Sequence, residues 1–121
     1  MSRASSRRAL VLVLVAGCGG SGMSGAVRED VNMRMESARP AITDCYASEL
    51  KPDRKLRGMM VLQFTAAPKS GRFEGISVIR DDMNDPQLQK CVTDAVGALQ
   101  LQNPQKTKLS VTYPLDFAPT K

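Results

Sequence analysis

The sequence predicts a small α+β domain with the element order helix, strand, strand, helix, strand. Three segments alternate apolar and polar residues, as half-buried strands do, and two others repeat apolar residues at the spacing of an amphipathic helix. The turn segment "PKSG", Pro68 to Gly71, joins the first two strands into a hairpin. Since crossover connections are right-handed, the simplest arrangement is a three-stranded antiparallel sheet, its first strand central and both helices on one face.

The first helical segment covers residues 27–51 and contains a proline. Its apolar stripe recurs at spacings of four, three, four and three: Val31, Met35, Ala38, Ile42 and Cys45. Pro40 removes one amide donor and crowds the preceding turn. We therefore expect either a kink at Pro40 or a second helix that begins there.

The hairpin is formed by two segments of different regularity. "GMMVLQFTA", from Gly58, alternates cleanly and has one strongly apolar face, as a central strand has. "RFEGISVIR" returns after the turn, but Phe73, Ile76 and Val78 cannot share one face by strict alternation. A β-bulge at Gly75 that resets the register resolves this conflict.

The second helix and the last strand have clear boundary signals. Asp85 can cap the helix, Pro86 suits its first position, and its apolar stripe is Leu88, Cys91, Val92, Ala95, Val96 and Leu99. The last strand, "KLSVTYPLDF", alternates through Leu109, Val111, Tyr113, Leu115 and Phe117. Pro114 has no amide to donate, so this strand is expected at the edge of the sheet.

Composition argues against two large classes of function. The chain has 121 residues, 4% aromatic content, no Trp and no His, so it lacks both a base-stacking platform and the commonest general base and metal ligand. Three of its 17 basic residues precede the apolar segment near the start, and the other 14 face 12 acidic residues. This near-equal balance does not give the excess of positive charge that nucleic-acid-binding domains have. Charges of mixed sign in residues 28–39 are typical of a solvated helix face.

No group of residues indicates catalysis. Asp81, Asp82 and Asp85 are close in sequence, but they lack the glycine and the distant glutamate of a calcium-binding loop. Loop solvation and helix capping explain them. Tyr46 is interpreted as a core residue. We expect a protein that is not an enzyme and that has no cofactor and no metal.

The first 17 residues resemble a secretory signal peptide, with a basic start, the apolar segment Ala9 to Val15 and small residues before Cys18. Seven apolar residues are too few to cross a bilayer core, which takes about 20 helical residues. "VAGC" resembles the lipobox of bacterial lipoproteins. The resemblance implies that Cys18 becomes the N-terminus and carries acyl chains such as palmitate; plain secretion and no cleavage are the alternatives.

Residues 18–26 are then expected to be the lipidated cysteine and a flexible tether. "GGSGMSG", Gly19 to Gly25, would reach about 15 Å. The lipoprotein resemblance implies a lipid-anchored protein of the cell envelope that faces the periplasm. Gly19 after Cys18, rather than Asp, favours the outer membrane over the inner membrane.

Cys45 and Cys91 remain once Cys18 is assigned to the lipid. Each lies on the apolar stripe of a predicted helix and is expected to face inward. The cysteines are 46 positions apart, and a bridge of that span would stabilise the domain by about 4 kcal/mol. We predict a structural disulfide. A redox-active pair is the alternative, but the chain has neither a C-x-x-C motif nor a histidine to activate a thiolate.

The element order, with "G-x-M-x-L-x-F-x-A", "SGRFEGISV" and the closing "LSVTYPLDF", resembles the C-terminal domain of TonB and of periplasmic TolA. The similarity is closer to the AgmX/PglI C-terminal domains, in which one helix carries Cys-Tyr, a later helix carries a second Cys, and the end reads Tyr-Pro-x-x-Phe. The matching residues are Cys45, Tyr46, Cys91, Tyr113, Pro114 and Phe117. The resemblance covers residues 36–118, and we place the domain at 27–118. Two features depart from it: Met60 and Leu62 replace valines, and "LQLQNPQKTK" lacks the Phe-Pro-x-P of the family.

The resemblance implies a non-catalytic protein-binding module. Its partner would be an envelope protein of a machine for motility, secretion or transport, added as a β-strand at the edge of the last strand. Ser110, Thr112, Pro114 and Asp116 are the candidate positions at this edge. Polar edge residues also occur without a partner, and Pro114 can serve to prevent pairing. The alternatives are edge-to-edge homodimerisation, a small-ligand-binding lipoprotein and a purely structural one.

Overall fold

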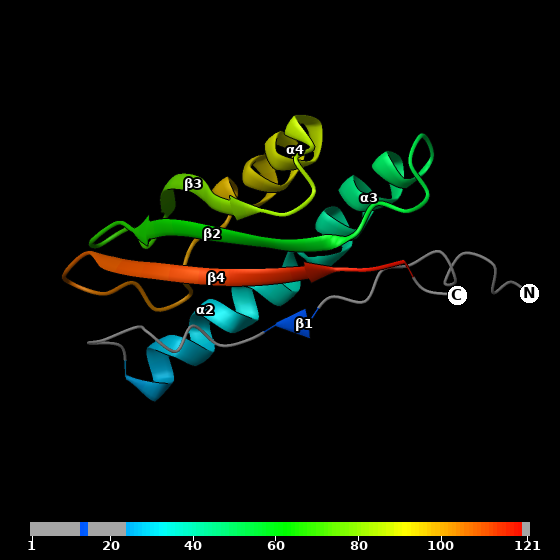
Figure 1. Ribbon diagram of the computed structural model, residues 1–121. Coiled ribbons are helices and arrows are strands. Elements are labelled where there is room, and N and C mark those ends of the chain that lie inside the picture. Colours follow the sequence, from blue (N-terminus) through cyan, green and yellow to red (C-terminus); the bar gives the residue numbers. More distant parts are fainter. Residues whose placement is uncertain (1–12, 15–23, 120–121) are drawn as a thin grey trace, which may run out of the picture.

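The computed structural model describes residues 13–14 and 24–119 of the chain. In chain order the elements are β1 (Val13–Leu14), α2 (Gly25–Ser37), α3 (Arg39–Leu50), β2 (Gly58–Ala66), β3 (Phe73–Asp81), α4 (Pro86–Gly97) and β4 (Leu109–Phe117) (Figure 1). The strand order is β1-β4-β2-β3, and all neighbours are antiparallel. The predicted α+β class and the three long antiparallel strands with β2 in the centre are confirmed.

The first helical segment is divided into two helices at the proline. Ala38 ends α2 and precedes α3, and Pro40 lies in the first turn of α3. A proline is tolerated there because the amide that it lacks would have no partner within the helix. The second of the two expected arrangements is therefore confirmed, with α3 beginning one residue earlier, at Arg39.

One face of the sheet forms the core with the helices. The inward residues of β2 and β4 are at most 2% exposed: Met60, Leu62, Phe64, Ala66, Val111, Tyr113, Leu115 and Phe117. Val31 and Met35 of α2, Ile42 and Tyr46 of α3, and the apolar stripe of α4 cover them. Every core residue of the described chain lies between Val31 and Phe117. Residues 24–121 therefore contain every core residue of the described chain.

The hairpin contains two irregularities, one of which was predicted. Gln63 pairs with Ser77 but Thr65 pairs with Glu74, so an extra residue is inserted at Gly75, whose φ is +62°. This is the predicted bulge. A second register shift, between Val61 and Leu62, leaves Ile79 outside the pairing and 52% exposed.

The predicted cap of α4 is present, but one residue of its predicted apolar stripe is not buried. Asp85 Oδ1 accepts hydrogen bonds from the backbone N–H groups of Gln87 (3.1 Å) and Leu88 (3.0 Å). The inward face is formed by Leu88, Val92 and Val96 at four-residue spacing, all 0% exposed. Cys91 is exposed. The expectation that Cys91 faces inward is wrong, because it lies one position away from this face and points to the side where α3 lies.

Candidate partner-binding edge

The four predicted edge positions lie in one row on β4. They alternate with the buried residues of the strand, so their side chains lie on the open face of the sheet, opposite the helices. Ser110 and Thr112 are exposed, whereas Pro114 and Asp116 are half-buried. Each has a cross-strand neighbour in β2, giving the pairs Ser110–Thr65, Thr112–Gln63, Pro114–Val61 and Asp116–Met59.

The outer edge of β4 is paired over part of its length. Val13 pairs with Asp116, and Leu14 pairs with Leu115, in antiparallel register (Figure 1). The prediction that the last strand lies at the edge thus needs a correction at its C-terminal end. The two pairing residues belong to the segment that resembles a signal peptide. At this end of β4, the outer edge is therefore paired with a two-residue strand of the same chain.

The predicted lipidation site and most of the predicted tether precede the first described helix. Residues 15–23, including Cys18, lie outside the described residues. Ser24 caps α2, and Gly25 and Ala26 lie in its first turn, so the last three residues of the expected tether 18–26 belong to this helix and its cap. In the described part of the chain, no helix has the length and apolar character needed to cross a membrane.

The cysteine pair joins two helices. Cys45 of α3 and Cys91 of α4 form a disulfide with a Cα–Cα distance of 5.8 Å. Cys45 is 5% exposed. The bridge therefore spans from the core to the surface and fastens α3 to α4.

The three aspartates each have a structural partner. Asp82 accepts from Arg80 Nε (3.0 Å) and from the backbone N–H of Met59 (3.2 Å). Asp81 accepts from the N–H of Met83 (2.8 Å) and from the side-chain amide of Gln89 (2.6 Å), while Asp85 caps α4. No group of three or more potential metal ligands occurs among the described residues. The interpretation of these aspartates as capping and loop residues agrees with these contacts.

Two tyrosines are buried in the core beneath the sheet. The hydroxyl of Tyr46 donates to the backbone carbonyl of Leu56, and its ring lies 5.1 Å from that of Phe117. Burial raises the pKa of Tyr46 to about 12, and burial likewise raises the pKa of Tyr113 to about 12. Tyr46 is 0% exposed and is therefore a core residue, as the sequence indicated.

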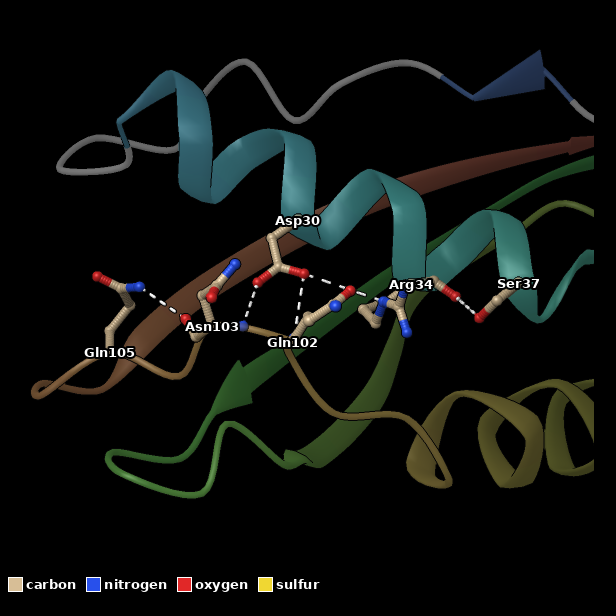
Figure 2. Close-up of polar contacts among 6 residues, drawn as sticks. All are labelled: Asp30, Arg34, Ser37, Gln102, Asn103 and Gln105. Atoms are coloured by element: carbon tan, nitrogen blue, oxygen red, sulfur yellow. Dashed lines mark hydrogen bonds and ion pairs between the residues drawn. The ribbon is translucent and has the colours of Figure 1, made fainter.

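Asp30 is a residue that sequence reasoning missed. The mixed charges of residues 28–39 indicate a solvated helix face, but Asp30 is only 8% exposed. Figure 2 shows its carboxylate between α2 and the segment that precedes β4: it accepts from the backbone N–H groups of Gln102 (3.1 Å) and Asn103 (2.9 Å). Asp30 thus holds this long connection against α2.

One cavity lies outside the sheet. It has a volume of about 540 Å³, is open to solvent, and is lined by the outer side of α3, the residues after it, and Pro119. Asp44, Lys51 and Arg54 supply its charged groups. None of the strands contributes to it, so this cavity does not lie between the sheet and the helices.

The comparisons with known proteins identify the fold. The structure is similar to the C-terminal domain of TonB from Helicobacter pylori, solved in solution, with a TM-score of 0.53 and 15% sequence identity over 88% of this chain and 97% of that one. The chain has a TonB C-terminal-like fold. No protein-family model matches the sequence, and no curated protein sequence matches it. The finer resemblance to AgmX/PglI domains therefore remains a prediction.

Proposed function

We propose that this chain is an envelope lipoprotein whose TonB-like domain binds an envelope protein by strand addition at the outer edge of β4. The partner would belong to a machine for motility, secretion or transport. The domain would act without catalysis or a cofactor, because recognition through main-chain hydrogen bonds needs neither.

The pairing of β1 with β4 is the observation that carries this proposal. It supports an edge that accepts an antiparallel strand at Leu115 and Asp116. If Cys18 becomes the N-terminus, Val13 and Leu14 leave with the signal peptide and the mature domain exposes this edge. An exposed edge has unpaired N–H and C=O groups that a partner strand can satisfy.

The lipid anchor is tested separately from the edge. We expect full-length protein expressed in a bacterial host to incorporate labelled palmitate, and Cys18→Ser to abolish the label. Fractionation of the same cells should place the wild-type protein mainly in the outer membrane, facing the periplasm. Unlabelled wild-type protein would contradict the anchor and would leave the edge-binding proposal standing.

Site-specific photo-crosslinking in intact envelopes tests the edge. A photoreactive residue at Thr112 should capture one partner protein. Gln63 is the matched control, because it is the exposed cross-strand neighbour of Thr112 on the same face but lies on the central strand. Gln87, exposed on α4, is the second control.

Each pattern of capture has a definite meaning. Capture at Thr112 alone supports strand addition at β4. Equal capture at Thr112 and Gln63 would move the binding site to the open face of the sheet. Capture of a second copy of the chain at Thr112 would replace the partner with a homodimer, and capture at none of the three positions would contradict the proposal.

A ligand-binding lipoprotein is the second candidate, and the cavity beside α3 favours it. Its three charged side chains would suit a small polar ligand. The cavity carries less weight than the edge, because it is open to solvent and offers no buried polar group to orient a ligand.

A further inference from the structure

The two ends of the sheet carry loops of very different charge. One end holds residues 67–72, between β2 and β3, and residues 98–108, between α4 and β4 (Figure 1). We call this the basic end. It carries four exposed basic residues, Lys69, Arg72, Lys106 and Lys108, and its two loops contain no acidic residue. None of the four forms an ion pair among the described residues.

The opposite end carries less net charge. Residues 51–57 hold four basic residues and one acidic residue, and residues 82–85, between β3 and α4, hold two acidic ones, so these two loops have a net charge of +1, against +4 at the basic end. They lie together, because Met59 and Asp82 exchange two hydrogen bonds, of 3.0 and 3.2 Å. Positive charge is thus concentrated at one end of the domain.

The loops of the basic end are fastened to each other. The N–H of Lys69 donates to the carbonyl of Gln105 (2.8 Å), and the N–H of Leu101 donates to the carbonyl of Gly71 (2.9 Å). The four basic residues therefore lie on two loops that are bonded to each other at the same end of the sheet.

The start of α2, the first described helix after Cys18 in the sequence, also lies at the basic end. Figure 2 shows that Asp30, one and a half turns into α2, binds the loop at Asn103, so the start of α2 lies beside this loop. Six residues separate Cys18 from the start of α2 at Gly25, and a segment of that length spans at most about 25 Å even when fully extended. Of the charged groups nearby, Arg28 and Glu29 cancel, Asp30 pairs with Arg34 (3.9 Å), and Glu74 is the acid that follows in β3.

We infer that the basic end is a membrane-facing surface that binds anionic phospholipid headgroups. This inference rests on the proposed lipid anchor, which keeps the basic end next to a bilayer. The surface would orient the domain, with β2 and β4 directed away from the membrane by about 30 Å for nine residues. Each basic residue near an anionic surface raises the affinity about fivefold, and the short tether makes such weak contacts sufficient.

Vesicle sedimentation of residues 24–121 tests the surface without the lipid. This segment contains every core residue of the described chain and lacks Cys18, so its binding does not depend on lipidation. We expect it to bind vesicles that contain phosphatidylglycerol and not vesicles of phosphatidylcholine alone. Binding should decrease between about 0.1 M and about 1 M salt, because the screening length shortens from ~10 Å to ~3 Å.

Two matched variants locate the binding surface. The basic-end variant replaces Lys69, Arg72, Lys106 and Lys108 with Gln, and the far-end variant does the same to Lys51, Arg54, Lys55 and Arg57. Both remove four positive charges from exposed loop positions. The basic-end variant should bind phosphatidylglycerol vesicles about tenfold more weakly or worse, whereas the far-end variant should stay within about twofold of wild type. Circular dichroism melts confirm that both are folded.

Three outcomes would overturn the inference: equal loss in the two variants, no preference for phosphatidylglycerol, or binding to purified peptidoglycan in place of vesicles. None of them would contradict the proposed function, which is judged by palmitate incorporation at Cys18 and capture at Thr112. If those two assays fail but residues 24–121 still bind phosphatidylglycerol vesicles through the basic end, the proposed function is refuted. The basic end then remains a lipid-binding surface.

Discussion

Asp30 accepts a 2.9 Å hydrogen bond from the backbone N–H of Asn103, 73 positions later in the chain. Its other carboxylate oxygen accepts from the N–H of Gln102 at 3.1 Å. Hydrogen bonds to a charged acceptor are stronger than neutral ones, and here they satisfy two amides of a long connection. A single side chain thus couples the first helix of the domain to the loop that leads into β4.

Asp30→Ala should destabilise the domain by about 1–3 kcal/mol, because it leaves two amides without their acceptor in a partly buried site. Urea unfolding of residues 24–121 measures the loss. Relative to wild type, the variant should show a larger increase in hydrogen exchange at the backbone amides of Gln102 and Asn103 than at other amides. Glu29→Gln, at the exposed neighbouring position, is the control and should change stability by less than about 0.5 kcal/mol. Equal effects of the two substitutions would contradict this role of Asp30.

The sequence predicts the elements of this fold well because their signals are local. Alternation identifies β2 and β4, the cap at Asp85 and Pro86 identifies the start of α4, and a conflict in alternation identifies the bulge at Gly75. Each depends on residues within one element. The order of elements and the handedness of crossovers then leave few possible sheets.

The contacts that escaped prediction join distant parts of the chain. Nothing around Asp30 distinguishes it from the exposed charges beside it, because its partners are backbone amides 72 and 73 positions away. The exposure of Cys91 depends on where α3 packs against α4. For the candidate site, alternation indicates which β4 residues share a face, but it contains no information on the pairing of Leu14 with Leu115.

The disulfide should contribute strongly to stability. We expect a Cys45→Ala, Cys91→Ala double variant to lose about 2–4 kcal/mol, because the unfolded chain is no longer constrained by the cross-link. Chemical unfolding with and without reductant measures this. Reductant should lower the stability of the wild type to near that of the variant and should leave the variant unchanged. Non-reducing peptide mapping should recover one fragment that links the two cysteines, and two free thiols would refute the bridge.

Gly75 should tolerate asparagine better than alanine. Its φ of +62° disfavours residues with a Cβ, although a Cβ there would meet only the Thr65 hydroxyl at 4.0 Å. Gly75→Ala is therefore expected to lose about 1–2 kcal/mol from backbone strain alone. Asparagine populates this region more readily, so Gly75→Asn should lose less, as thermal melts can measure. If Gly75→Asn loses more stability than Gly75→Ala, the size of the side chain, rather than the backbone conformation, is the reason that this position needs glycine.

Glu49 of α3 should make stability depend on pH. Burial, followed by a hydrogen bond to the Asp85 carboxyl and repulsion from its charge, raises the pKa of Glu49 above its ordinary value. The folded protein therefore holds this proton more tightly than the unfolded chain does, and stability falls as pH rises through the raised pKa. At neutral pH the ionised Glu49 is unfavourable next to Asp85.

Glu49→Gln removes this charge and keeps the shape of the side chain. We expect the variant to melt about 2 °C above wild type at pH 7, an effect typical of a surface position. The difference should shrink as pH falls to the ordinary range of carboxyl pKa values, where wild-type Glu49 is protonated. Asp44→Asn is the matched control, because it removes one negative charge from an exposed position of the same helix. If both variants gain the same stability at pH 7, the effect comes from net charge and the pairing of Glu49 with Asp85 is not its cause.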